Sequence, residues 1–592
     1  MTTDIRLPPA APATAHQPVA TPPRRRRGRP RIGTIVVLIV LAYLVIGPIL
    51  MLLLSSFEDT SGGVVVRPPF PWTLQNFVTV LTTSKTLSVL GATLVFAVAC
   101  LIVGFVISFA LAWVVERTDV PLPGFIYVLV VAPAGMPGVI SAIAWSLLMN
   151  PTNGFLNVLI RAVTGSTGEG PLNAYSLGGM IFVQGIALVP LTFLLITASL
   201  RNMSPNLEDA ARASGARPWT VMRRVSLPLL TPVLIGALVY QFVTVIEGVD
   251  IPLVLGLPGR VTVFSTQVYL TTHSAFGLPN YGVSSTYGIL LLVLAVAPLL
   301  IYNRVVRRSQ DYATVSGKAF RPTRRKLGRW RWVTFAAIMV YVFISFVLPL
   351  LVLLYASLQP FVGAFTLASL SRLTFSGYAS TFSSSLFWSS LGHTVIIGFV
   401  ASFAVMAFSV ALSWIIVRSK SKLAWIADVL AFIPHAIPGI VIGLAVLLIY
   451  LLIPAQVYGT VWIIVIAMVT QYISLGTRLT TGGIAQIQVG LEEAARTSGA
   501  RGWQVWRSVL LPLLRPAIIN GFMLVFLATI KNLTLPLMLQ SSDNVVLSTL
   551  IWNDWNDGKV TETAVLSVVL TAVTVVASIL LRRFSGSGEE LK

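Results

Sequence analysis

The residues with the clearest potential for chemistry are ionisable side chains inside long apolar stretches. Glu247, Asp250 and Lys531 each lie in such a stretch, and Lys531 follows Glu247 by 284 residues, the offset of an internal repeat. Charges in an apolar environment are costly and usually face a bundle interior or a water-filled cavity. We therefore consider three roles for Glu247 and Lys531: an ion pair across a two-fold interface, a contact with cargo or a gate, or exposure near the outer membrane edge. Asp250 is assigned to the same pathway.

His435 is a second candidate, because histidine is a common metal ligand. It has no second histidine and no carboxylate at ligand spacing, so a packed polar residue is favoured and we predict no metal site. The single cysteine, Cys100, excludes a disulfide framework, a zinc cluster and an iron–sulfur site. The sequence contains neither a nucleophile–base constellation nor the phosphate-binding pattern G-x4-G-K-[ST]. We expect a chain that is not an enzyme and has no cofactor of its own.

The composition shows which environment must surround these residues. The chain has 592 residues, of which 56% are hydrophobic and only 10% are charged, against about 25% charged residues in ordinary soluble domains. Its mean hydropathy is +0.85. A soluble fold cannot hide that much apolar surface from water, so lipid must be part of the solvent. A spanning helix needs roughly 20 apolar residues, and the sequence contains twelve such segments. They are residues 33–55, 87–115, 124–149, 178–200, 233–255, 286–306, 332–356, 391–416, 425–453, 459–477, 516–540 and 562–581.

The net charge of +21 follows from topology rather than from a nucleic-acid partner. The basic excess collects in alternate loops, in the arginine-rich end of residues 1–31 and in the linker 307–331. Retention of Lys and Arg on the cytoplasmic side is the usual topological bias. We therefore expect cytoplasmic N- and C-termini, contact with membrane lipid and no nucleic-acid partner. Residues 1–31, rich in Pro and Ala, are expected to be disordered.

Internal repeats divide the chain into two halves. The segment 207–232, LEDAARASGARPWTVMRRVSLPLLTP, matches the segment 491–516, LEEAARTSGARGWQVWRSVLLPLLRP, at 18 of 26 positions without a gap. Six predicted spans precede the linker and six follow it, so the two units have the same orientation in the membrane. We predict an all-α membrane protein with a first transmembrane domain over 32–306 and a second over 332–592.

A second repeated pair interrupts apolar spans with prolines. Its members are Pro133, Pro137 and Gly138 in the first half and Pro434, His435, Pro438 and Gly439 in the second. Broken helices are tolerated at membrane depth where protein or a water-filled cavity satisfies the freed backbone groups. We interpret both segments as lining the translocation pathway, the alternative being an ordinary proline kink in a packed helix.

The repeat 207–232/491–516 falls in inward-facing loops between the fourth and fifth spans of each half. Its first part favours a helix, with the acid-to-base pairs Glu208–Arg212 and Glu492–Arg496 spaced to interact along it. Gly215 or Gly499 then ends or bends that helix. A solvated loop would carry no demand for so many identities, so we interpret the element as a docking site for two identical partners. The residues concerned are Glu208, Asp209, Ala210, Ala211 and Gly215, with Glu492, Glu493, Ala494, Ala495 and Gly499.

These residues resemble the pattern E-A-A-x3-G-x9-I-x-L-P of the permeases of binding-protein-dependent ATP-binding cassette (ABC) importers. The departures are Asp209 for Glu in the first copy, and Val225 and Val509 for Ile. The tandem fusion of two six-span units further resembles the ferric-iron transport permeases. The resemblance implies a type I importer permease fold in a bacterial inner membrane. It covers nearly the whole chain after residue 31.

The resemblance also implies partners and a mechanism. An extracytoplasmic binding protein would deliver cargo, and two copies of a separate ATPase would use ATP, bind the docking loops and drive alternating access. Ferric iron is the favoured cargo; thiamine, aminoethylphosphonate, polyamines and oxyanions are alternatives within the same architecture. A twelve-span secondary transporter is the alternative class, but it would have no need of paired docking helices.

Overall fold

The computed structural model describes residues 32–59, 71–203, 205–273, 278–309, 325–364, 366–419, 422–453 and 456–584. The regular secondary structure of these described residues is helical, apart from two isolated β-bridges. Ten of the described helices are long and apolar enough to cross a membrane, and two pairs of helices bent by more than 40° pass the same test together. The twelve predicted spans correspond to these ten helices and two bent pairs. The predicted tail 1–31 and most of the predicted linker 307–331 lie outside the described residues.

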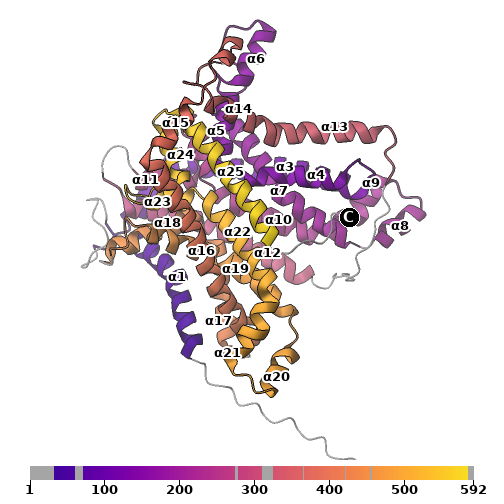
Figure 1. Cartoon of the computed structure of the whole chain (residues 1–592), viewed down its shortest axis with the longest axis vertical. Coiled ribbons are helices and arrows are strands. Elements are labelled where there is room, and N and C mark those ends of the chain that lie inside the picture. The colour runs from indigo at the N-terminus through magenta and orange to yellow at the C-terminus, as the bar shows by residue number, and fades with distance from the viewer. Residues whose placement is uncertain are drawn as a thin grey trace, which may run out of the picture.

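The first half contains six spans and several short helices (Figure 1). They are α1 (Ile32–Ser56), α2 (Gln75–Thr82), α3 (Ser84–Arg117), α4 (Pro123–Val131), η1 (Ala132–Gly135), α5 (Gly138–Met149), α6 (Phe155–Thr164), α7 (Leu177–Asn202), α8 (Pro205–Ala213), α9 (Pro218–Val221), η2 (Met222–Ser226), α10 (Leu227–Glu247), η3 (Pro252–Gly256), α11 (Phe264–Thr272) and α12 (Tyr281–Ser309).

The second half repeats this order. It comprises α13 (Trp330–Val342), η5 (Phe343–Val347), α14 (Leu348–Ser357), η6 (Leu367–Arg372), α15 (Ser376–Ser383), α16 (Ser385–Arg418), α17 (Lys422–Phe432), η7 (Ile433–Ala436), α18 (Gly439–Leu452), α19 (Val461–Gln486), α20 (Val489–Thr497), α21 (Gly502–Val505), η8 (Trp506–Leu510), α22 (Leu511–Lys531), α23 (Thr534–Leu539), α24 (Leu547–Asn556) and α25 (Val560–Phe584). The connection between α5 and α7 is longer than its counterpart between α18 and α19, and it contains α6, which projects from one end of the molecule in Figure 1.

Each half packs against the broken helix of the other half. The first span α1 packs against α18 of the second half, and α14 packs against α5 of the first half. The last spans follow the same rule, because α12 contacts η7 and α25 contacts η1. Each broken helix is therefore held by elements of the opposite half.

The predicted fifth and eleventh spans, 233–255 and 516–540, end earlier than expected. The helices α10 and α22 stop at Glu247 and Lys531, where Gly248 and Asn532 adopt extended backbone. The chain then turns inward as η3 and α23, which contain buried leucines and valines next to a proline. Proline has no backbone N–H and cannot donate to the preceding turn of a helix, so it favours such an interruption.

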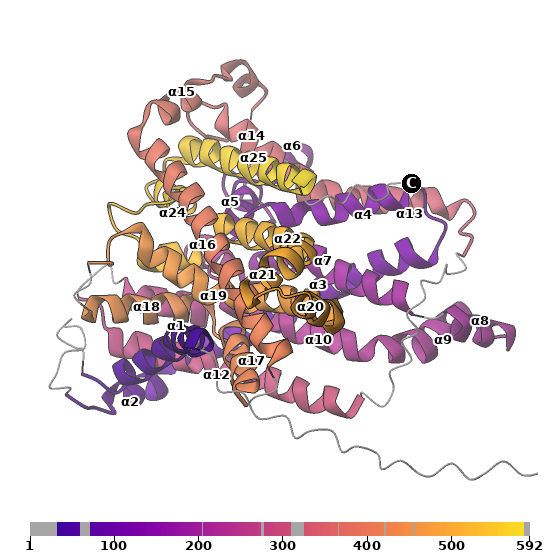
Figure 2. The same ribbon diagram turned by 60° about the horizontal axis from the view of Figure 1, so that its bottom comes forward.

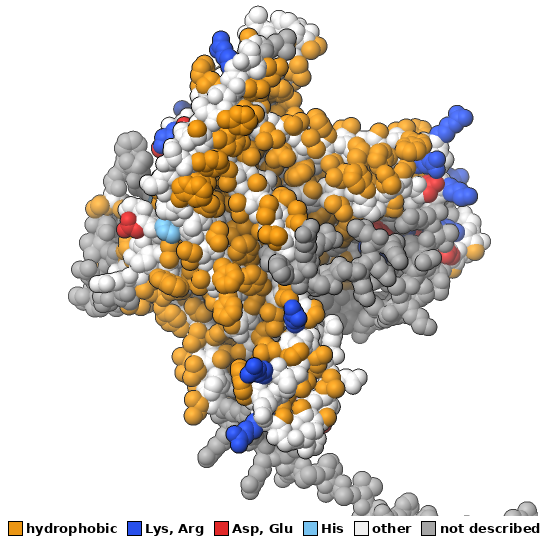
Figure 3. Space-filling view, in the orientation of Figure 1, with side chains coloured by type: hydrophobic (Ala, Val, Ile, Leu, Met, Phe, Trp, Pro, Cys, Tyr) orange, Lys and Arg blue, Asp and Glu red, His pale blue; other side chains and the backbone are white. Residues whose placement is uncertain are grey.

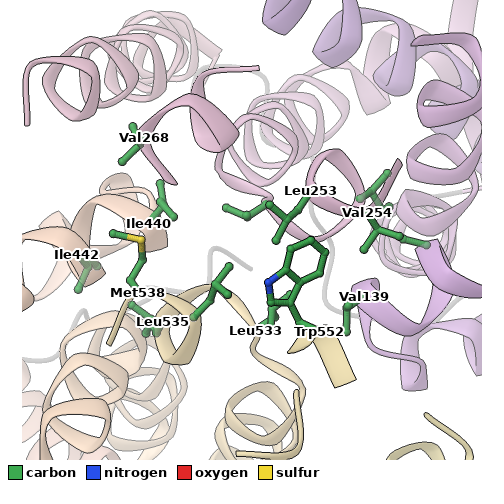
Figure 4. Close-up of a cluster of buried hydrophobic side chains, with 14 of the residues drawn as sticks. Val139, Leu253, Val254, Val268, Ile440, Ile442, Leu533, Leu535, Met538 and Trp552 are labelled. Carbon is green, nitrogen blue, oxygen red and sulfur yellow. The ribbon is translucent and has the colours of Figure 1, made fainter. Parts of the chain in front are cut away.

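The main hydrophobic core includes both of these inward turns. Figure 4 shows Leu253 and Val254 of η3 on one side, and Leu533, Leu535 and Met538 of the second half on the other. Each turn packs within its own half, η3 against α5 and α7, and α23 against α18 and α19. Apolar side chains also cover much of the outer surface in Figure 3, while Lys and Arg gather near its right and lower ends.

Candidate functional site

The two docking loops have the same backbone geometry. Helix α8 ends before Gly215 at φ +79°, and α20 ends before Gly499 at φ +87°. The amide of Ala216 donates to the Ala211 carbonyl and the amide of Ala500 donates to the Ala495 carbonyl, each at 3.0 Å. This is the helix ending that a left-handed glycine allows, and it satisfies carbonyls that the helix leaves free. The predicted helix–glycine–helix element is present in both halves.

The two elements project from separate parts of the molecule (Figures 1 and 2). Asp209, Ala210 and Gly215 are exposed on the first, and so are Glu493, Ala494 and Gly499 on the second; Ala211 and Ala495 are half-buried. The next helix begins with Trp219 or Trp503, whose side chains are 67% and 69% exposed. Leu207 and Leu491 are also exposed. Each element thus presents one leucine, one tryptophan and one acid outward, at equivalent positions.

Glu208 and Glu492, by contrast, point into the protein. In the first element, Arg117 Nε at the end of α3 donates to Glu208 Oε1 at 3.1 Å, and both side chains are at most 3% exposed. Arg117 Nη2 also donates to the Leu200 carbonyl near the end of α7 at 3.0 Å. Ser226 Oγ donates to Glu208 Oε1 at 2.9 Å. One guanidinium therefore connects α3, α7 and α8.

The second element repeats the arrangement with different numbers. Arg418 Nε at the end of α16 donates to Glu492 Oε1 at 2.6 Å. Arg418 Nη2 donates to the Ile487 carbonyl, just after the end of α19, at 2.8 Å. It also donates to the Ile484 carbonyl, in the last turn of α19, at 3.4 Å. We call Arg117–Glu208 and Arg418–Glu492 the two anchor pairs.

One of the two predicted acid-to-base pairs in these loops is confirmed and the other is wrong. The Glu208–Arg212 pair forms at 3.4 Å. Glu492 pairs with Arg418 instead, and the predicted pair with Arg496 is absent from the ion pairs of the described residues. The pairing partners Arg117 and Arg418 were missed altogether. A signal for them existed, because each ends an apolar span and they are related by 301 residues, the offset of the Pro–Gly segments.

The Pro–Gly segments bend far more sharply than an ordinary proline kink. Helix axes before and after the break meet at 94° in the first half and 106° in the second. Gly138 and Gly439 begin the second limbs, α5 and α18, while Pro133 and Pro434 lie in the one-turn segments η1 and η7. The structure thus places a helix C-terminus and a helix N-terminus at each break. Such ends carry unsatisfied carbonyl and amide groups.

Glu247 and Lys531 do not pair in this structure. Lys531 Nζ donates to the Ala134 carbonyl at 2.7 Å, in the broken helix of the opposite half. The Glu247 carboxyl lies beside the Gly439 amide, again in the opposite half. Each side chain leaves the end of its span and reaches a backbone group of suitable polarity, so neither needs the other as a partner.

The remaining pathway candidates lie around the same breaks. Asp250, which was expected one turn beyond Glu247 in a continuous helix, lies past the helix end against Gly138, where an added Cβ would come within 2.5 Å of its Oδ2. His435 stacks on Tyr240 of the first half with ring centroids 5.4 Å apart. No group of three or more His, Cys, Asp and Glu able to hold a metal occurs among the described residues. Polar side chains thus gather at the two breaks, and their types differ between the two halves.

Comparison with known proteins assigns the chain to a class. The family model for the inner membrane component of binding-protein-dependent transport systems matches residues 104–311 and 407–586. These matches cover more than half of the chain, so it belongs to this family and is a multi-pass inner-membrane permease built from two tandem units. Both matched segments contain a broken helix and a docking element.

Individual relatives narrow the comparison. A putative ferric transport system permease protein of Haemophilus influenzae is 27% identical over 377 residues, covering 63% of this chain and 58% of the relative. A ferric transport system permease protein of Actinobacillus pleuropneumoniae is 27% identical over 410 residues, covering 67% and 58%. The chain thus matches less than two thirds of the length of these relatives. A trehalose/maltose transport system permease protein of Thermococcus litoralis is 29% identical over 195 residues, covering 32% of this chain and 64% of the relative.

Among solved structures, the chain is similar to a chain of a bacterial ABC transporter that imports the acidic polysaccharide alginate. The TM-score is 0.36 with 17% identity, covering 44% of this chain and 96% of the other. A chain of a bacterial alginate ABC transporter, in complex with a pentasaccharide-bound periplasmic protein, gives a TM-score of 0.39 with 18% identity, covering 48% and 96%.

Proposed function

We propose that this chain is the permease subunit that forms the translocation pathway of an ABC importer, with two six-span units on one polypeptide. An extracytoplasmic binding protein delivers the cargo, and two copies of a separate ATPase bind α8 and α20 on the cytoplasmic side. The observation that carries the proposal is the docking element, which occurs twice with the same exposed leucine, acid, glycine and tryptophan. Two equivalent surfaces suit two copies of one partner.

The docking contact has a defined chemistry in this proposal. Trp219 and Trp503 insert as apolar anchors, because a large, rigid aromatic side chain contributes most when it becomes fully desolvated in a partner's cleft. Leu207 and Leu491 pack beside them, and Asp209 and Glu493 approach basic groups of the ATPase. Closure of the two ATPases on ATP then moves both elements. The free energy reaches the membrane only through those contacts.

The cargo passes between the two broken helices. In this conformation, Lys531 donates to the Ala134 carbonyl, and the Glu247 carboxyl lies beside the Gly439 amide, each in the opposite half. These cross-contacts must rearrange when the halves rock between inward-open and outward-open states. We assign Glu247, Asp250, His435 and Lys531 to the wall of that pathway.

Ferric iron is the proposed cargo, supported by the names of the two ferric permease relatives. The chain is also similar to a trehalose/maltose transport system permease protein and to a putative 2-aminoethylphosphonate transport system permease protein of Salmonella typhimurium, the latter 27% identical over 198 residues. Cargo choice therefore rests largely with the binding protein, which is another chain.

Co-purification tests the proposal directly. The tagged chain should retain an ATPase subunit at two copies per permease, and deletion of 207–216 together with 491–500 should release it. Uptake by the intact complex should need ATP and the binding protein, and the ligand of that binding protein identifies the cargo. Uptake that follows a proton gradient, without any ATPase bound, would instead establish the secondary transporter.

A further inference from the structure

The two anchor pairs join three elements at a single charged group in each half. The Arg117 guanidinium lies at the end of α3. It donates hydrogen bonds to Glu208 of the docking helix α8 and to the Leu200 carbonyl of α7. The Arg418 guanidinium lies at the end of α16. It donates hydrogen bonds to Glu492 of α20 and to the Ile484 and Ile487 carbonyls at the end of α19. A planar guanidinium with several fixed donors can make such a connection, whereas the single ammonium of lysine cannot reproduce it.

The recurrence of this arrangement is independent of loop length. The two arginines are 301 residues apart, but the two glutamates are 284 apart, because the first half is longer between them. Each guanidinium nevertheless meets the glutamate of its own docking helix, at 3.1 Å and 2.6 Å. The same contact has therefore been maintained in both halves despite a change in the intervening chain.

The burial of these pairs indicates that stability alone does not account for them. Arg117 and Glu208 are 2% and 3% exposed, and Arg418 and Glu492 are 12% and 6% exposed. A buried ion pair replaced by apolar groups of similar volume often leaves a protein equally stable. An ionic contact at this point fixes direction and distance, which apolar packing does not.

We propose that Arg117 and Arg418 are positioning residues that hold each docking helix rigidly to two membrane spans, so that movement of an ATPase is transmitted to the pathway. This inference rests on the proposed function. Loss of an anchor pair leaves the exposed docking surface in place but loosens its connection to α3 and α7, or to α16 and α19. ATP is then hydrolysed with less cargo moved.

The two halves depend on their arginines to different extents. The first docking helix is held by additional polar contacts, from Ser226 and Arg212 to Glu208. The second-half counterpart of Ser226 is the apolar residue Leu510, and Arg496, the counterpart of Arg212, forms no ion pair with Glu492 among the described residues. A separate ion pair, Arg201–Glu116 at 2.8 Å, does not involve the docking helix, and its second-half counterparts are Ala485 and Val417. Glu208 therefore keeps donors when Arg117 alone is lost, so Arg418→Met should uncouple transport more than Arg117→Met.

The test uses the intact complex of permease, ATPases and binding protein in proteoliposomes. The variant Arg418→Met with Glu492→Leu removes both charges of the second anchor pair, and Arg117→Met with Glu208→Leu does so in the first. The control, Glu116→Val with Arg201→Ala, removes another ion pair near the same end of α7 without touching a docking helix. Measured quantities are ATPase co-purification, ATP hydrolysis and cargo moved per ATP.

We expect all three variants to retain the ATPases, and cargo moved per ATP to fall about fivefold or more for the Arg418 pair. The Arg117 pair variant, which also removes the Ser226 and Arg212 contacts of Glu208, should show a comparable fall, and the control should show none. Of the single variants, Arg117→Met should show a smaller fall than Arg418→Met. Arg418→Lys, which keeps the charge but loses the fork of donors, should lie between wild type and the double variant. It serves as the deciding variant if the double variant does not assemble.

An unchanged ratio of transport to hydrolysis in the Arg418 variants overturns the inference while leaving the proposed function intact. An equal fall in the control does the same, because it would indicate a general weakening of the cytoplasmic ends. A wild-type chain that binds no ATPase overturns the proposed function itself, and this inference with it.

Discussion

The docking elements and the polar groups between the halves descend from the same internal repeat, yet they differ in how alike their two copies are. On the cytoplasmic elements, Leu207, Glu208, Gly215 and Trp219 have identical counterparts at the 284-residue offset. Between the halves, by the same offset, Glu247 corresponds to Lys531 and Asp250 to Thr534. Tyr240 corresponds to Leu524, and His435 corresponds to Ala134 at the offset of the broken helices.

This contrast indicates which kind of binding partner each region suits. Two equal surfaces suit two copies of one partner, because an identical partner imposes the same complementarity twice. A pathway between unequal walls presents opposite charges on its two sides, which two identical walls could not do. Under the proposed function, the repeat is therefore symmetric at the docking surfaces and asymmetric along the pathway.

The largest expected effect tests the symmetry of the docking surfaces. Trp219→Ala and Trp503→Ala should each weaken ATPase binding by about 2 kcal/mol or more, as expected for a central aromatic anchor. The double variant should lose co-purification of the ATPases and all transport. Binding measured by titration of the purified ATPase should weaken equally for the two single variants. Trp462→Ala, an exposed tryptophan at the opposite end of α19 from α20, should leave it unchanged.

The polar groups between the halves should respond differently, because Glu247 and Lys531 act separately. Lys531→Met and Glu247→Gln should each reduce uptake by about tenfold, as expected for loss of a hydrogen bond to a charged group. Their effects should add within about 0.5 kcal/mol in a double-mutant cycle, since each side chain contacts backbone rather than the other. Initial uptake rates measure the cycle. A coupling well above that value would show that the two charges pair in another state of the transport cycle.

Making the polar groups between the halves more symmetric should have a smaller effect. Tyr240→Leu with His435→Ala gives each position the residue of the opposite half and removes the stacked ring pair. An aromatic pair contributes about 0.5–1.5 kcal/mol beyond its buried area, so uptake should change severalfold. Retention of ATPases should be unaffected. A loss of ATPase binding in this variant would contradict the separation of the two regions.

The smallest expected effect concerns the turn inside the docking element. Gly499→Ala should destabilise the loop by about 1 kcal/mol, because Gly499 has φ +87° and a Cβ disfavours that conformation even where space is open. Gly490→Ala in α20 is the matched control, since its Cβ would also meet open space but its φ is not left-handed. Hydrogen exchange of the loop measures both variants. Equal protection in the two would show that the glycine turn is not needed.

The sequence by itself determined the class of protein and much of the architecture. Apolar segment length determined the spans, because lipid requires about 20 residues per crossing. The gapless repeat revealed two units and two docking helices, and the paired prolines located the breaks at Pro133–Gly138 and Pro434–Gly439. These features are local or periodic, so they can be recognised along the chain without knowing which segments meet.

Only the tertiary structure decided which groups meet. It brought Arg117 to Glu208, 91 residues away, and Lys531 to the Ala134 carbonyl, 397 residues away. It also ended the fifth and eleventh spans at Glu247 and Lys531, which set their charges against the broken helices of the opposite half. Charge and repeat position identified Glu247 and Lys531 as candidates. A buried charge, however, can interact with any group of suitable polarity within reach. The partner is therefore chosen by how the helices pack, which no local pattern records.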